Sequence, residues 1–196
     1  MPQTTPRFSR LTSLLFLVVG LTLALPSFAA RRTRQEQRAS LVWYLNAYEL
    51  KLTRESLDRI GPDVAELLVD ILNTPDAFLK VRVRACAGLA LYPSQQSFDV
   101  LRELLHERSL IGTELGVQLR RQALRSLGKG FGDRAVDDII HLRGDPEPLV
   151  REAVAHALGD AGSERALPML ETWLSVEPVL HVRMAVDSTV ARLRGR

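Results

Sequence analysis

The stretch LVREAVAHALGDAG, residues 149–162, decides the fold. Its apolar residues Val150, Val154 and Leu158 are spaced four apart, which places all three on one face of a helix. Gly159 and Gly162 follow this face, and glycine commonly ends a helix. The stretch therefore predicts one amphipathic helix and a turn after it.

The same ten-residue pattern occurs four times along the chain, with apolar residues at its first, fifth and ninth positions. The four copies lie at 81–90, 119–128, 150–159 and 182–191. A second apolar stretch follows each of the first three copies, at 97–107, 134–142 and 164–174. Self-similarity at a spacing of 30 to 40 residues is typical of stacked helix pairs. We therefore expect an all-α protein, a right-handed α-solenoid of stacked antiparallel helix pairs.

Residues 150–174 resemble the short HEAT-like repeats of the phycobilisome-lyase type. That family's pattern is V-R-x-x-A-x-x-A-L-G, then a turn, then A-L-x-x-L. The positions that fill it here are Val150, Arg151, Val154, Ala157, Leu158, Gly159, Ala166, Leu167 and Leu170. The resemblance covers about residues 52–196. It implies a HEAT-like scaffold that binds a protein partner on a concave surface, with an enzyme or enzyme auxiliary of the phycobilisome-lyase-like class as the alternative.

The N-terminus has the three parts of a secretory signal peptide. Arg7 and Arg10 precede an apolar run at residues 11–25, and Ser27 and Ala29 are small residues that suit cleavage after Ala29. We therefore expect residues 1–29 to be a signal peptide and the protein to be periplasmic or secreted, with no membrane span after cleavage. The alternative is an N-terminal membrane anchor, since three arginines follow the apolar run.

The domain organisation follows from these two features. Residues 30–51 are predicted to form a basic segment and a capping helix, and residues 52–196 the HEAT-like repeat domain. Trp43, Tyr44 and Tyr48 lie in the capping helix, where they are expected to close the end of the stack. A second interpretation of these aromatic residues is a docking patch.

The charge balance argues against nucleic acid as a partner. Residues 1–29 contain two of the 26 basic residues and no acidic residue, so the remaining chain has a net charge of +1. A nucleic-acid-binding protein usually has a large basic excess on one face. We expect a protein partner instead, and a stacking oligomer through the unpaired last helix is a further possibility.

An arginine stands at the second position of every copy, and an acidic residue lies six positions before it. We interpret these as a structural ladder of ion pairs within each unit, because an arginine in the first turn of a helix needs an acidic partner. The alternative is a row of arginines that binds an acidic partner. The predicted pairs are Asp76–Arg82, Glu114–Arg120, Asp145–Arg151 and Glu177–Arg183.

The polar residues of the second helices are the candidate binding surface. By resemblance, these helices line the concave side of the solenoid. The candidates are Asp99, Arg102, Glu103, Asp137, Asp138, His141 and Glu171. A merely solvated face is the competing interpretation.

No pattern typical of catalysis or cofactor binding is visible in the sequence. The four histidines do not form a pair three or four residues apart, as a metal site on one helix would need. Cys86 occupies an apolar column and is expected to be a half-buried hydrophobe. The glycines of LGKGFGD, residues 127–133, follow a helix and not a strand, so we interpret Gly128 as a helix end and not as part of a phosphate loop. We expect no enzyme activity, no metal and no cofactor.

Overall fold

The computed structural model describes residues 32–49 and 51–195, and these residues are helical with no strand among them. The predicted signal peptide lies outside the described residues. The helices are α1 (Arg34–Asn46), α2 (Arg54–Asp58), α3 (Val64–Leu72), α4 (Leu79–Leu89), α5 (Gln95–His106), α6 (Glu114–Phe131), α7 (Val136–His141), α8 (Pro148–Ala161), α9 (Leu167–Val176) and α10 (Leu180–Arg194). Short 3₁₀ turns lie at Arg108–Leu110, Gly132–Ala135, Leu142–Gly144 and Glu164–Ala166.

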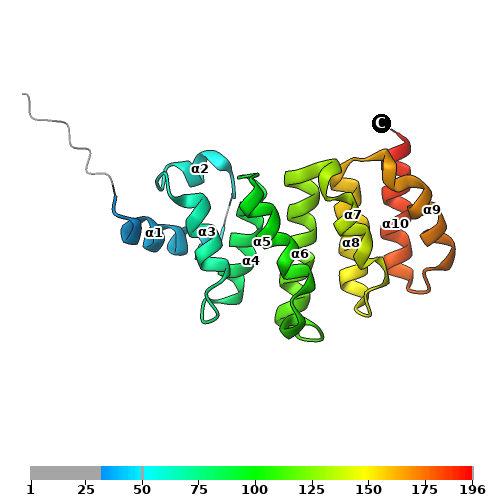
Figure 1. The fold of residues 1–196 in the computed structure, drawn as a ribbon, viewed down its shortest axis with the longest axis horizontal. Helices are drawn as coiled ribbons and strands as arrows, with labels where there is room; N and C mark the ends of the chain where they lie inside the picture. The colour runs from blue at the N-terminus through cyan, green and yellow to red at the C-terminus, as the bar shows by residue number, and fades with distance from the viewer. Residues whose placement is uncertain (1–31, 50, 196) are drawn as a thin grey trace, which may run out of the picture. The chain divides into compact units, whose positions relative to one another are not determined.

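The four repeated segments form α4, α6, α8 and α10, and each of these helices packs against the next. Helices α5, α7 and α9 each pack against the repeated helix that follows them. The loops that precede the four repeated helices lie on one edge, the lower edge in Figure 1. The chain therefore forms a row of helix pairs, with the predicted apolar stripe at its centre.

The apolar stripe of the sequence pattern is confirmed as the core. Its twelve positions are all buried, and none has more than 5% of its surface exposed. These residues are Val81, Ala85, Leu89, Leu119, Ala123, Leu127, Val150, Val154, Leu158, Val182, Val186 and Val190.

The interpretation of Gly128 and Gly159 as helix ends is wrong. Helix α6 continues past Gly128 to Phe131, and α8 continues past Gly159 to a left-handed cap at Gly162 (φ 70°). Gly128 instead permits close approach between helices, and Gly159 leaves room for the Arg192 side chain of α10. A Cβ on Gly128 would lie 2.3 Å from the carbonyl oxygen of Ala157 on α8.

The N-terminal helix α1 belongs to the row and does not only cover its end. It packs against α3 and α4, so the predicted boundary at residue 52 falls inside the packed unit. Arg84 of α4 donates hydrogen bonds of 2.8 and 2.6 Å to the carbonyl oxygens of Leu45 and Ala47, which end α1. These bonds satisfy carbonyl groups that have no partner within the helix.

Of the three aromatic residues expected to close the stack, Tyr44 packs against the core, but Trp43 and Tyr48 do not. Trp43 is 77% exposed and Tyr48 is 94% exposed, while Tyr44 is half-buried and donates a hydrogen bond to Lys51. Leu41 and Leu45 are the fully buried residues of α1. They make the contact with the neighbouring helices, because they lie on its inner face one turn apart.

Candidate functional site

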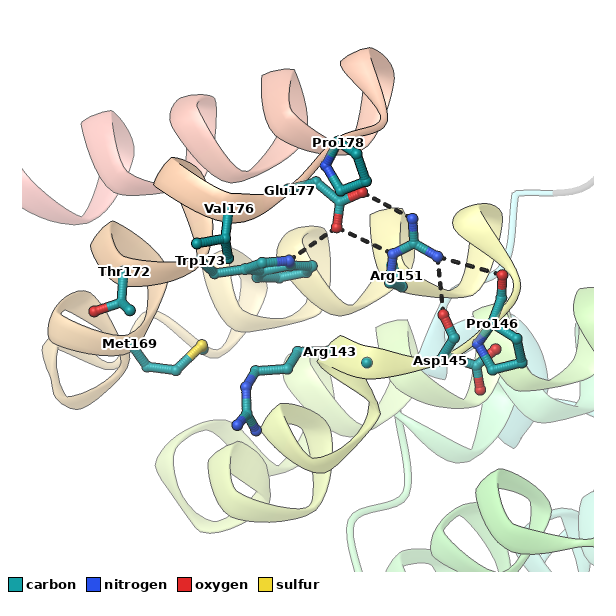
Figure 2. A pocket seen from close by; sticks show the side chains of 11 residues that line it. Arg143, Asp145, Pro146, Arg151, Met169, Thr172, Trp173, Val176, Glu177 and Pro178 are labelled. Carbon is teal, nitrogen blue, oxygen red and sulfur yellow. Dashed lines mark hydrogen bonds and ion pairs between the residues drawn. The ribbon is translucent and has the colours of Figure 1, made fainter.

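A hollow of about 740 Å³ lies between the segment that precedes α8 and the helix α9 with the turn after it. Figure 2 shows Met169, Thr172, Trp173 and Val176 on α9, and Arg143 on the facing segment. Pro146 and Pro178 come from the two loops that border the hollow. The lining therefore combines an apolar floor with side chains from two successive units.

The polar groups in the floor of the hollow bind one another. The Glu177 carboxylate accepts two hydrogen bonds from Arg151, of 3.0 and 2.8 Å, and one of 3.0 Å from the indole N–H of Trp173 (Figure 2). Glu177 is only 4% exposed. The arginine lowers the pKa of the Glu177 carboxyl, and the hydrogen bond from Trp173 acts in the same direction. The floor is therefore a rigid, internally satisfied network.

The predicted ion-pair ladder pairs the wrong acids. Arg151 makes its ion pair with Glu177 of the next unit, and its own loop acid, Asp145, offers it only a backbone carbonyl at 2.9 Å. Asp145 instead binds Arg120 of the preceding unit, and both side chains are buried. The pairs therefore link neighbouring units and do not lie within them. The reason is that the arginine side chain extends to the acid in the loop of the next unit. The loop before its own helix offers it backbone carbonyl oxygens.

The two outer arginines of the ladder form no such pair among the described residues. Arg82 donates to the carbonyl oxygen of Leu72 at 3.0 Å, and Arg183 to that of Glu177 at 3.4 Å. Glu177, the predicted partner of Arg183, binds Arg151 instead. Asp76, the predicted partner of Arg82, is exposed, and so is Glu114, the predicted partner of Arg120. The predicted ladder is thus reduced to two buried pairs, at Arg120–Asp145 and Arg151–Glu177.

Three of the acidic second-helix residues predicted to bind a partner form ion pairs with arginines of the same chain. Asp99 contacts Arg102 at 3.7 Å within α5, while Asp137 and Glu171 each bind an arginine at 2.7 Å. These two arginines are Arg165 and Arg194. Because their charges are matched locally, these acids add little net charge to the surface.

Three of the predicted residues do come together in a second hollow. Arg102, Glu103 and Asp138 line it with His106 and Glu107. The ring of His106 meets that of His141 edge to face, with the centroids 5.9 Å apart. Within residues 32–49 and 51–195, no group of three or more potential ligands is placed to hold a metal ion.

Cys86 is fully buried and not half-buried as expected. Burial raises the pKa of its thiol to about 12, and a hydrogen bond with Ser126 only partly opposes this. The thiol is therefore held neutral inside the core.

Arg143, Met169 and Trp173 were not among the residues predicted from the sequence. One signal was available, because Trp173 and Glu177 are four residues apart and so meet on one face of a helix turn. Arg143 carried no signal, since it lies outside the repeated pattern.

Residues 117–189 match the family model for HEAT repeats. The match supports a HEAT-repeat family for this part of the chain. All residues that line the hollow at Trp173 lie inside this HEAT-repeat segment. The helix pair at α4 and α5 precedes the matched HEAT segment and has the same buried pattern. Comparison with curated proteins gave no match.

None of the helices in the described part of the chain combines the length and the apolar character needed to cross a bilayer.

Proposed function

We propose that this protein is an exported, non-catalytic HEAT-repeat scaffold, a right-handed α-solenoid that binds a protein partner in the hollow at Trp173. The observation that carries this proposal is the hollow itself, which has an apolar floor and buried polar groups that already satisfy one another. A surface that is ordered before binding loses little conformational freedom when a partner docks.

The exposure of the apolar side chains around the hollow supports a binding role. Val176, which lines the hollow, is 69% exposed. Apolar groups that remain in contact with water gain free energy when a partner covers them. Because Arg151 and Glu177 are bound to each other, neither is free to act as an acid or base toward a ligand.

A stacking oligomer through α10 has less support than a separate partner. Asp187 occupies the sixth position of its copy of the repeat. In the other three repeated helices this position holds a buried residue, Cys86, Leu124 or Ala155. Asp187 is exposed on α10, and a helix stacked there would have to bury its carboxylate.

Site-specific crosslinking in the native cell tests the proposed function. A photoreactive residue replaces Thr172, which lies in the hollow and is exposed, and in a matched variant it replaces Ser188, which is exposed on α10. We expect a specific protein adduct at position 172 that is absent at 188. The same adducts at both positions, or none at 172, would overturn the assignment of the hollow as the binding site.

Export is the second part of the proposal, and it rests on the arginine-led apolar run at residues 11–25 and the small residues before Ala30. Sequencing the N-terminus of the native protein tests it. We expect the mature chain to begin at Ala30. A chain that retains residues 1–29 would support the membrane-anchored alternative.

A further inference from the structure

The hollow at Trp173 holds one charge that no neighbour neutralises. The Arg143 guanidinium makes a single long hydrogen bond, of 3.5 Å to the carbonyl oxygen of Ile140, and it forms no ion pair within the described part of the chain. The other charged groups of the hollow are matched: Arg151 pairs with Glu177, and Asp145 pairs with Arg120. Arg143 is therefore the charged residue of the lining that has no ion pair within the described part of the chain.

This charge lies beside an apolar floor. Trp173, Met169 and Val176 present apolar atoms on α9, and Arg143 stands on the facing segment (Figure 2). A guanidinium binds a carboxylate with two parallel hydrogen bonds, and its attraction grows when an apolar group nearby excludes water.

The loops that border the hollow limit the kind of contact a partner can make. Pro146 and Pro178 have no backbone N–H, so these positions cannot donate hydrogen bonds to a neighbouring strand. The described residues also contain no strand whose edge a partner could extend, so recognition depends on the side chains of the partner and not on added strand pairing.

We propose that the hollow binds a short segment of a partner protein in which a large apolar side chain lies next to an aspartate or glutamate. The apolar side chain contacts Trp173 and Met169, and the carboxylate binds Arg143. This inference rests on the proposed function, because it names the chemistry of the partner at the same site.

Phage that display random twelve-residue peptides are selected for binding to the full chain, and this selection tests the proposed chemistry. The variant Arg143→Glu reverses the charge. The matched control is Arg108→Glu, because Arg108 is also exposed and lies away from the hollow. Circular dichroism spectra of both variants report whether the fold is retained.

We expect the selected peptides to share an apolar residue adjacent to an acid. A synthetic peptide of this kind should lose at least about tenfold in affinity on Arg143→Glu and change less than about twofold on Arg108→Glu, since only the first variant removes the ion pair. Changing the acid of the peptide to its amide should weaken binding to the wild type and not to Arg143→Glu.

Selected peptides without an acid, or with equal affinity for Arg143→Glu and the wild type, would overturn the proposed chemistry. The crosslinking at Thr172 separates this failure from failure of the proposed function. If an adduct forms at position 172 but the selected peptides show no preference for an acid, the scaffold function is supported and only the inference about the partner is wrong. Peptides that depend on Arg143, with no adduct at 172, overturn the function and leave only the peptide chemistry.

Discussion

At the scale of single residues, Glu177 connects α8, α9 and the turn before α10. Its carboxylate accepts hydrogen bonds from Arg151 on α8, from Trp173 on α9 and from the backbone N–H of Val179, which precedes α10. A buried carboxylate with three donors is stable only while all of them remain. Glu177 therefore holds together the floor of the hollow and the turn into the last helix.

The substitution Glu177→Gln should destabilise the protein by about 3 kcal/mol, because it leaves the charge of the partly buried Arg151 without its carboxylate partner. Urea denaturation followed by circular dichroism measures the free energy of unfolding. Glu171→Gln is the matched control, since its ion pair with Arg194 is exposed and worth little. Equal losses in the two variants would contradict the buried role of Glu177.

The pH dependence of stability should report the same carboxylate. Its pKa is lowered from the ordinary value of 4.5, so its contribution is fully present above 4.5 and is lost as the pH falls through the lower pKa of the folded state. The difference in unfolding free energy between wild type and Glu177→Gln should be constant above a pH of about 5.5 and shrink below 4.5. A difference that does not change down to acid unfolding would argue against this coupling.

At the scale of elements, small and hydroxyl residues set the spacing of the repeated helices. Ser126 on α6 donates to the carbonyl oxygen of Cys86 on α4 at 2.9 Å, and Thr189 on α10 donates to that of Ala155 on α8 at 3.0 Å. Between α6 and α8, Gly128 permits the contact instead. Ser126 and Thr189 occupy the same position of the repeated pattern, whereas the role of Gly128 was hidden by its similarity to a helix end.

The substitution Gly128→Ala should lower the free energy of unfolding by about 2 kcal/mol, because the added methyl group would meet the backbone of α8 and force the helices apart. At a solvent-exposed helix position, replacement of glycine by alanine would instead stabilise the helix. Gly144→Ala is the control, since nothing lies within 4 Å of the added methyl group. If urea denaturation shows Gly128→Ala to be as stable as the control, the helices are not in close contact at this point.

At the scale of the molecule, the repeat predicted the core because burial follows the helical period directly. The register of the ion pairs could not be predicted, since it depends on how far one unit is displaced along the next. The exposed position of Trp43 also depended on which face of α1 turns inward. Arg143 became visible as a candidate only when the structure placed it beside Trp173, a residue 30 positions away in the chain.

The placement of α1 gives a prediction about the whole row. Trp43→Ala should change the unfolding free energy by less than about 0.5 kcal/mol, because its side chain is exposed. Leu41→Ala should cost about 3 kcal/mol, because Leu41 is fully buried against the row. Thermal and urea denaturation of the two variants compare them directly. A larger loss for Trp43→Ala would restore the interpretation that the aromatic residues close the stack.

Competition of the crosslink at position 172 by a selected acidic peptide tests most directly whether a cellular partner occupies the hollow through an apolar side chain and a carboxylate. We expect excess peptide to abolish the adduct, while the same peptide with its acid changed to the amide leaves most of it. An adduct that persists in excess of the acidic peptide would contradict this mode of binding.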